Sequence, residues 1–495
     1  MPTFLTSIPG KLVVFSLFVL ILSFSNTASA ADYEETACPF DTSSLVVRVR
    51  CGILTVPENR LQADSRQIVL MVMIAESPNP DKSPDPVVYL TGGPGESAIA
   101  AMVPIFSSDA GLLLVRDRDW IVVDQRGTGY SVPRLDCNIF GIARLASTTA
   151  LMEASSVCYE RYNAAGIDLN GYTTAENAAD IAALREAMGH DEWNLFGVSY
   201  GTTLALSIMD LYPLGVRSVI LDSTLPPQRS FFLSDVENKL AALERLFEAC
   251  RQDAACNSAY PDLAERFDAA VQALNEQPLE LEGLQLNGDF LVFALTNTAL
   301  FQRDVIQQLP AILDSALNGD IDPLAALLGN VASGADSSGG YESDLVAAND
   351  GMGLAMNCSR DALFPDLREQ LIAIGARSAV AASLSNLYLR YLDACEPWNS
   401  ALEGGAVPEP VQSDIPTLFF VGEWDPSTPL ALAQETAETL THNTIVVFPG
   451  QGHSILLEAQ SDCAATLFND FLAQLDRSLN TDCVATAYPP LSFSE

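Results

Sequence analysis

The strongest constraint on the fold of this chain is a series of short apolar runs that each end at a small or polar residue. PVVYL ends before Thr91, WIVV before Asp124, WNLFGV before Ser199 and VRSVIL before Asp222. Short, nearly continuous apolar runs separated by helical stretches are typical of parallel strands buried on both faces of a sheet. A helix with three-to-four spacing of its apolar residues is expected over 174–188. The pattern predicts an α/β fold with a mostly parallel sheet.

The segments around these runs extend the prediction. Between Val46 and Glu76, two β-rich runs joined by a turn predict antiparallel strands at one edge of the sheet. From about Leu225 to about Val411 helical patterns dominate, and β/α alternation then resumes with PTLFFVGEWD and TIVVFPGQGH. We therefore expect a helical cap inserted between two halves of one sheet. The expected segments are a first core half (31–224), a cap (225–410) and a second core half (411–495).

The first thirty residues have the features of an export signal. Lys11 precedes an apolar run from Leu12 to Phe24, and the small residues Ala28-Ser29-Ala30 follow. This run is too short to span a bilayer, but it fits a signal peptide over residues 1–30 with cleavage after Ala30. The alternative is an uncleaved N-terminal anchor. The expected location is secreted or periplasmic.

The cysteine content agrees with export. All ten cysteines follow Ala30, and an even number in an oxidising compartment indicates disulfides. No CxxC pair occurs and the chain has only three His, so we expect no structural zinc and no other metal. Their spacing suggests pairing between sequential neighbours: Cys38–Cys51, Cys137–Cys158, Cys250–Cys256, Cys358–Cys395 and Cys463–Cys483.

The net charge restricts the partners. Asp and Glu number 63 against 25 Lys and Arg, which gives a formal charge of −38. Such a surface repels nucleic acid and anionic membranes, so neither is an expected partner of the mature chain. The charge has two interpretations: an acidic cleft that attracts cationic groups such as a free peptide amine, or general solubility outside the cell.

A candidate nucleophile follows the third apolar run. The segment 197–201, GVSYG, matches G-x-S-x-G between an expected strand and the helix-compatible TTLALSIMDLY. This is the context that the motif requires, because the chain turns sharply from strand to helix and the glycines keep a Cβ from blocking the turn. Ser199 is therefore the predicted nucleophile, and a purely structural serine is the alternative.

A serine hydroxyl needs a base, and the base needs a carboxylate that orients it. His453 directly follows the last expected strand, whereas His190 and His442 each precede a strand. Asp425 follows the strand LFFVG, and Glu423 is its rival. The order Ser, Asp, His along the chain is that of α/β-hydrolases. Ser199, Asp425 and His453 form the predicted triad.

The oxyanion formed during acyl transfer requires preorganised N–H donors. One expected donor is the backbone N–H of Tyr200, directly after the nucleophile. The other is expected in the loop Thr91-Gly92-Gly93-Pro94-Gly95, where glycines allow close approach of the backbone to a substrate, and Gly93 is the preferred candidate.

The runs GGPG, DQRGTGYS, GVSYG, GEWDPSTP and GQGH together resemble the proline-iminopeptidase and tripeptidyl-aminopeptidase group of secreted α/β-hydrolases. The segment from Cys395 through His453 also resembles the C-terminal portion of the tripeptidyl-aminopeptidase branch. The resemblance implies a serine exopeptidase that acts at peptide N-termini without a metal or organic cofactor. It implies the triad and oxyanion donors given above, and it makes Asp124 and Arg126 residues that shape the loop near the site.

Two positions depart from this resemblance. Thr91 stands where relatives often have His, a change that leaves the backbone donor in place. Arg360 stands where many relatives have an acidic residue that holds the substrate's α-ammonium by charge-assisted hydrogen bonds. That role then falls to Asp361, Glu396 or Glu96, or to none of them, and Arg360 could instead favour a substrate carboxylate.

The leading hypothesis is a secreted aminopeptidase that cleaves near free N-termini through an acyl-enzyme, with a peptide or small acyl compound as substrate. A carboxylesterase or other acyl hydrolase with the same triad is the alternative enzyme. A non-catalytic hydrolase-fold binding protein is the alternative from another class.

Overall fold

The computed structural model describes residues 31–137, 148–281, 284–332, 349–401, 406–458 and 462–493. The expected signal peptide over 1–30 lies outside the described residues. In the ranges just given, no helix combines the length and the apolar character needed to cross a bilayer.

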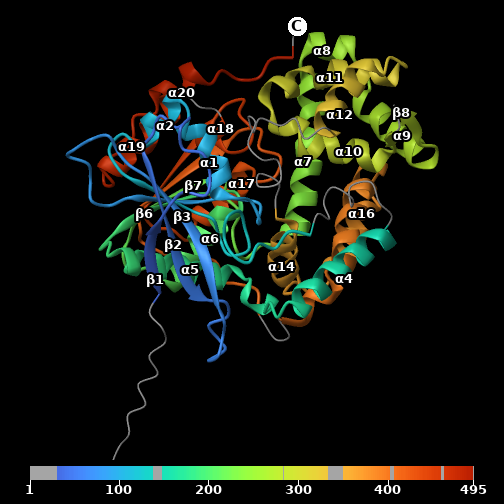
Figure 1. The fold of residues 1–495 in the computed structure, drawn as a ribbon. Helices are drawn as coiled ribbons and strands as arrows, with labels where there is room; N and C mark the ends of the chain where they lie inside the picture. The colour runs from blue at the N-terminus through green and yellow to red at the C-terminus, as the bar shows by residue number, and fades with distance from the viewer. Residues whose placement is uncertain are drawn as a thin grey trace, which may run out of the picture. The chain divides into compact units, whose positions relative to one another are not determined.

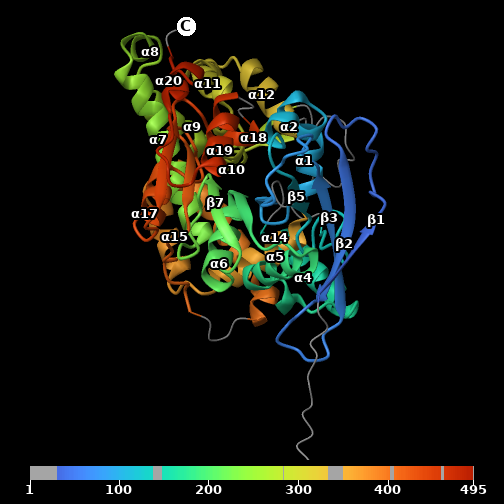
Figure 2. The same ribbon diagram turned by 90° about the vertical axis from the view of Figure 1, so that its left-hand side faces the viewer.

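A nine-stranded sheet with the order β1-β2-β3-β5-β4-β6-β7-β10-β11 forms the centre of the fold. All pairs from β5 to β11 are parallel, whereas β1, β2, β3 and β5 pair in antiparallel fashion, which confirms the expected fold class. Figure 2 shows β1–β3 together at one edge of the sheet. The strands are β1 Asp32–Thr36, β2 Val49–Pro57, β3 Gln67–Ala75, β4 Val87–Leu90, β5 Trp120–Val123, β6 Trp193–Val198, β7 Val216–Asp222, β10 Thr417–Gly422 and β11 Asn443–Phe448.

The central strands are buried on both faces because successive side chains point to opposite sides of a sheet. In β6, Leu195 belongs to one apolar core and Phe196 to a second core on the other face. Helices α5 (Thr174–Met188) and α6 (Tyr200–Leu211) cover the first face. The second face is covered by α1 (Ala98–Phe106), α2 (Asp109–Leu114) and α19 (Asp462–Ala473) (Figure 1). Thr173 caps the N-terminus of α5, and Gly189 ends this helix with φ 72°.

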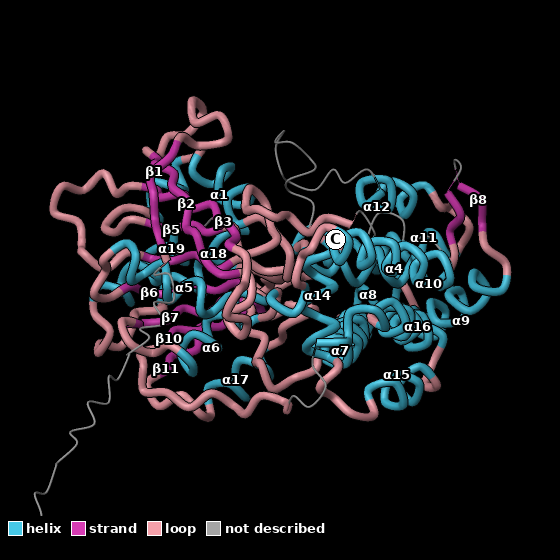
Figure 3. Tube along the Cα trace, turned by 60° about the horizontal axis from the view of Figure 1, so that its bottom comes forward, coloured by secondary structure: helices cyan, strands magenta, loops and turns pink. Residues whose placement is uncertain are grey.

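Most of the described residues between β7 and β10 are helical, and β8 (Leu279–Leu281) and β9 (Leu284–Leu286) form a hairpin among them (Figure 3). Helix α4 (Thr148–Ala164), which precedes β6 in the sequence, also packs in this region. The Ser155 hydroxyl donates to the Ala394 carbonyl at 2.6 Å and accepts from the Trp398 indole at 2.8 Å. The inserted helices are α7 Phe231–Gln252, α8 Ala254–Ala259, α9 Leu263–Glu276, α10 Gly288–Asn297, α11 Arg303–Leu317, α12 Asp322–Ala332, α14 Asp350–Asp361, α15 Leu367–Gly375 and α16 Ala379–Ala394, with the 3₁₀ turns η2 Ala299–Phe301 and η3 Glu396–Ala401.

Five disulfides are present, and their pairing is the one that the spacing suggests. Cys38–Cys51 fixes the segment after β1 to β2, and Cys358–Cys395 joins α14 to the residue after α16. Such links stabilise a fold mainly by restricting the unfolded chain.

Candidate active site

The candidate nucleophile lies at a sharp turn between β6 and α6. Ser199 has φ 54° and ψ −122°, a conformation that is costly for a residue with a side chain. A Cβ on Gly197 would lie 2.4 Å from the Gly201 carbonyl oxygen, and a Cβ on Gly201 would lie 1.9 Å from the Leu90 carbonyl oxygen. Both glycines are therefore required for this turn to pack against its neighbours.

The three predicted triad residues follow strands that are close neighbours in the sheet. Ser199 follows β6, Asp425 follows β10 and His453 follows β11, and the sheet order in this part is β6-β7-β10-β11. Because these strands are parallel, their carboxyl ends meet at one edge. His190 precedes β6 and His442 precedes β11, so both lie at the opposite edge.

Asp425 and His453 are joined directly. His453 Nδ1 lies 2.8 Å from Asp425 Oδ2, which leaves Nε2 on the far side of the ring for another partner. Asp425 also accepts hydrogen bonds from the backbone N–H groups of Ser427 (2.9 Å) and Thr428 (2.8 Å) and from the Thr428 hydroxyl (2.7 Å). The rival Glu423 instead accepts from the Gly450 N–H and pairs with Arg245. Of these two carboxylates, Asp425 is therefore the one that contacts the imidazole.

The two groups shift each other's pKa. Burial alone would raise the pKa of Asp425, but His453 and the hydrogen bonds from Thr428 outweigh it and lower this pKa to about 2. Burial opposes the charged imidazolium of His453, yet the nearby carboxylates, mainly Asp425, raise the pKa of His453 above its ordinary value. Asp425 therefore stays ionised, and the neighbouring His453 imidazole accepts a proton more readily than a free one.

The end of β7 connects the nucleophile turn to the histidine loop. The Asp222 carbonyl accepts from the Ser199 N–H at 3.0 Å. The Asp222 carboxylate accepts from the backbone N–H groups of Ile455 (2.9 Å) and Leu456 (2.8 Å), and the Ser223 hydroxyl accepts from the Ser454 N–H at 2.9 Å. Asp222 is fully buried, and this burial raises its pKa to about 6 against the effect of its hydrogen bonds. Asp222 holds the positions of Ser199 and His453 relative to each other.

We expect Asp222→Asn to lower kcat by about a hundredfold, the size of effect that a displacement of about 1 Å at a reacting group can produce. The amide nitrogen of the substituted side chain would face a backbone N–H in place of an acceptor and so displace the loop that carries the imidazole. Steady-state kinetics check this, with KM expected to change less than kcat. Asp85→Asn is the matched control, since Asp85 is a buried carboxylate paired with Arg118 and Asn194 ahead of β4. Equal losses in both variants would assign Asp222 a purely structural role.

The expected oxyanion loop lies against the nucleophile. A Cβ on Gly92 would lie 3.1 Å from the Ser199 Cβ, and Gly93 adopts φ 100° in the turn that follows. Tyr200 begins α6, with its buried hydroxyl 3.1 Å from that of Thr174. Asn349 fixes the loop from the cap side, because its backbone and side-chain N–H groups both donate to the Gly95 carbonyl, at 2.7 and 2.9 Å.

Asp124 binds the segment that directly follows the expected oxyanion loop. Its buried carboxylate accepts from the Ser97 hydroxyl (2.8 Å) and from the N–H groups of Ile99 (3.0 Å) and Tyr130 (2.8 Å). Burial raises the pKa of Asp124 to about 6, although these donors favour the charged form. Arg126, which is also buried, pairs with Asp180 at 2.8 Å. Both residues contact protein groups that shape the loops, as the motif suggests.

Comparison with known proteins agrees with this geometry. The family model described as "alpha/beta hydrolase fold" matches residues 85–460. This chain belongs to the α/β-hydrolase fold family. The hydrolase is 25% identical to the serine protease Hip1 of Mycobacterium tuberculosis over 452 residues, which cover 83% of this chain and 82% of that protein. It is 29% identical to a tripeptidyl aminopeptidase of Streptomyces coelicolor over 214 residues, which cover 40% of this chain and 38% of that protein.

Among solved structures, an esterase from Thermogutta terrifontis has 15% sequence identity and a TM-score of 0.36, with 86% of this chain and 99% of that chain covered. The matches confirm the expected resemblance to the proline-iminopeptidase and tripeptidyl-aminopeptidase group. The chain is a serine hydrolase with peptidases among its relatives.

Residues of the inserted helices that the sequence pattern did not reveal contact His453 and the turn over residues 425–428, which we call the acid loop. On α7, Asp235 accepts from the Ser427 hydroxyl at 2.9 Å and Asn238 donates to the Ser427 carbonyl at 2.7 Å. The Phe301 ring lies edge-on to the His453 imidazole, with 5.3 Å between centroids. These contacts join segments about 150 to 190 residues apart. No local motif signals them, because each residue type is ordinary in its own helix or turn.

The candidate substrate-binding carboxylates occupy three different environments. Glu96 is exposed, lies 3.5 Å from the Thr91 hydroxyl and is close enough to contribute to the raised pKa of His453. Asp361 is buried at the end of α14, where one oxygen accepts from the Ser230 hydroxyl and the Phe232 N–H, and the other has no hydrogen-bond partner in the described chain. Glu396 is exposed at the start of η3. Of these three carboxylates, Glu96 is the one that acts electrostatically on His453 within the part of the chain that the structure describes.

Proposed function

We propose that this hydrolase is an exported serine exopeptidase that cleaves peptide bonds near free N-termini, with Ser199, Asp425 and His453 as its triad. The observation that carries the proposal is the short Asp425–His453 contact at the sheet edge where the nucleophile turn of Ser199 also lies. The five disulfides support a location outside the cytoplasm, secreted or periplasmic.

In the proposed reaction the Ser199 hydroxyl oxygen attacks the scissile carbonyl carbon while His453 Nε2 takes the hydroxyl proton. The resulting oxyanion accepts hydrogen bonds from the backbone N–H groups of Gly93 and Tyr200. The C–N bond then breaks as His453 returns the proton to the leaving amine. Water, deprotonated by His453, hydrolyses the acyl ester and restores the serine. Asp425 stays ionised and holds the imidazole in the required tautomer.

The peptidase assignment is further supported by carboxylates suited to an ammonium group. Among the described residues, one buried oxygen of Asp361 has no hydrogen-bond partner, and burial raises the pKa of this carboxyl to about 6 even though Arg360 and the Ser230 hydroxyl favour its charged form. A substrate ammonium would supply the missing donor. Glu96, near His453, is a second candidate, and Glu396 is a third. The net charge of −38 would attract cationic substrates from a distance.

A substrate panel tests the proposal against the carboxylesterase alternative. Aminoacyl and tripeptidyl amides with a free amine are compared with their N-acetylated forms and with simple esters. We expect at least about tenfold higher kcat/KM for the free amine, the size expected for a hydrogen bond between charged groups. Asp361→Asn should remove most of this preference, whereas Asp366→Asn, at the exposed start of α15, should keep it. Indifference of the native enzyme to N-acetylation would favour the esterase.

The pH dependence of kcat/KM provides a separate prediction. His453 must be neutral to accept the serine proton, and Asp425 raises the pKa of His453 above the ordinary 6.5. Activity should therefore fall as the pH drops through a value above 6.5, because the imidazolium form has no site for the proton. A pH–rate profile with a non-titrating substrate checks this. If the midpoint of the acidic limb lay below pH 6.5, it would contradict the proposed effect of Asp425 on His453.

A further inference from the structure

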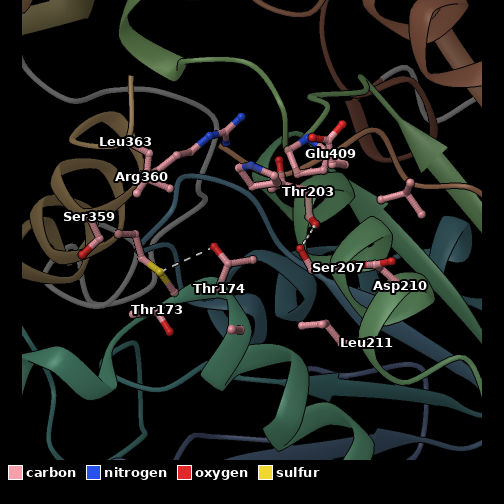
Figure 4. A pocket seen from close by; sticks show the side chains of 15 residues that line it. Thr173, Thr174, Thr203, Ser207, Asp210, Leu211, Ser359, Arg360, Leu363 and Glu409 are labelled. Atoms are coloured by element: carbon pink, nitrogen blue, oxygen red, sulfur yellow. Dashed lines mark hydrogen bonds between the residues drawn. The ribbon is translucent and has the colours of Figure 1, made fainter. Parts of the chain in front are cut away.

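A pocket of about 290 Å³ lies between the first core half and the cap, away from the triad side chains. Helices α5 and α6 contribute one side, α14 contributes another, and residues 408–411 complete the wall (Figure 4). Ser199, Asp425 and His453 do not line it. The volume is sufficient for a small organic molecule or a short peptide segment, near the lower end of the range for ligand sites.

Arg360 supplies the positive charge of this pocket. Its guanidinium donates to the backbone carbonyls of Pro226 (2.8 Å) and Arg229 (2.6 and 3.0 Å). No carboxylate within the described ranges lies at ion-pair distance from it. The adjacent Asp361 favours the charged form of Arg360 at longer range, but accepts its own hydrogen bonds from Ser230 and Phe232. Carbonyl groups orient a guanidinium without neutralising it, and Asp361 acts on it only from beyond ion-pair distance. A carboxylate of a ligand would therefore supply the direct ion pair that Arg360 lacks within the described residues.

The other residues of the wall favour an anionic ligand that also has an apolar part. Apolar side chains such as Met356 and Leu363 form part of the wall, while Thr174 and Ser207 add hydroxyl groups. Asp210 and Glu409 also line the pocket, and both are exposed to solvent. Figure 4 shows Asp210 on the opposite side of the pocket from Arg360. A ligand with one carboxylate at Arg360, an apolar body and no second anionic group therefore fits these walls.

The pocket also borders a residue of the proposed oxyanion hole. The Tyr200 hydroxyl contacts the Thr174 hydroxyl at 3.1 Å and the Met356 sulfur at 3.6 Å, and both partners line the pocket. On α6, Thr203, Ser207 and Leu211 line it at intervals of four residues, and residues so spaced share one face of a helix. The pocket therefore lies along one face of α6, the helix that begins directly after Ser199.

We propose that this pocket binds the C-terminal carboxylate of a short peptide, with Arg360 as the anion-binding residue. The inference rests on the proposed peptidase function for the identity of the ligand, but not for the existence of the site. The carboxylate has two possible sources: the leaving part of a short substrate, or a separate peptide such as a released product.

Binding is tested in the Ser199→Ala background, where no turnover is expected. Isothermal titration calorimetry compares an apolar tripeptide acid with its C-terminal amide. We expect the acid to bind about tenfold more tightly or better, and Arg360→Gln to abolish this difference. Ala175→Phe should weaken both peptides by filling the pocket from an exposed position on α5, without removing the charge. Arg377→Gln, an exposed arginine between α15 and α16, is the matched control and should keep the preference.

Equal binding of acid and amide, or a preference that survives in Arg360→Gln, would overturn the proposal. A kinetic experiment with the active enzyme distinguishes the two sources. A higher kcat/KM for peptide acids than for their amides indicates the leaving part of a substrate. Equal kcat/KM values together with inhibition of a chromogenic amide substrate by the peptide acid indicate a separate ligand. Calorimetry does not require turnover, so loss of the proposed peptidase activity and loss of this site remain distinguishable.

Discussion

Ser199→Ala is expected to lower kcat by about 10⁶-fold, the loss seen when a triad nucleophile is removed from a serine peptidase. Without the hydroxyl no acyl-enzyme forms, and the residual rate comes from the oxyanion donors and substrate binding alone. Alanine keeps the Cβ of the strained turn, so the fold should be retained. The measurement is single-turnover and steady-state hydrolysis of a free-amine peptide amide, together with labelling by a fluorophosphonate.

The matched control for this variant is Ser218→Ala. Ser218 is also buried in the central sheet. It lies on β7, upstream of the candidate site, and its hydroxyl donates to the side-chain oxygen of Asn194 on β6 at 2.7 Å. Its loss should cost about 1 kcal/mol of stability and leave labelling intact. Persistent turnover or labelling in Ser199→Ala would mean that another group is the nucleophile, and a non-catalytic binding protein would show neither even in the native chain.

Most of the sheet could be predicted from the sequence because its central strands are buried on both faces. Runs such as WNLFGV and PTLFFVG carry that burial in their own composition. Strand β1, Asp32–Thr36, could not be predicted in this way, since DYEET is polar and mostly exposed. Its pairing with β2 depends on backbone hydrogen bonds and on the ion pair between Glu35 and Arg50.

The candidate triad could be predicted for a similar reason. A residue that directly follows a buried strand is placed by the strand itself, so the sequence positions of Ser199, Asp425 and His453 already contained most of the geometry. The contacts of Asp222 with Ile455 and Leu456 could not be anticipated, because they join a strand end to a loop more than 230 residues later. The packing of α4 with the cap is likewise a property of the tertiary structure.

The acid loop shows how these two kinds of information combine. Asp425 is placed by β10 and bonded by the N–H groups of its own turn, both of which are local features. The same turn is held by Asp235 and Asn238 from α7, inside the inserted helices. Residues of α7 and of the core therefore bind the same loop. We expect a change in the packing of α7 to shift Ser427, and with it Asp425, even when no substrate is bound.

Asp425→Asn is expected to lower kcat by about 10⁴-fold, with little change in KM. The Asn amide cannot hold the imidazole in the tautomer that presents a lone pair to the Ser199 hydroxyl. The variant also loses the negative charge that, more than any other group, raises the pKa of His453. The acidic limb of the residual pH–rate profile should therefore move to lower pH, because the imidazolium form is no longer stabilised by a neighbouring carboxylate.

Glu423→Gln provides the matched control, since it removes the rival carboxylate of the same loop. Its side chain binds the Gly450 N–H and Arg245, and an amide oxygen can still accept the hydrogen bond from Gly450. We expect kcat to change by no more than a few-fold and the pH profile to stay in place. If Glu423→Gln instead moved the profile and Asp425→Asn did not, the 2.8 Å contact between Asp425 and His453 would not be the one that governs proton transfer.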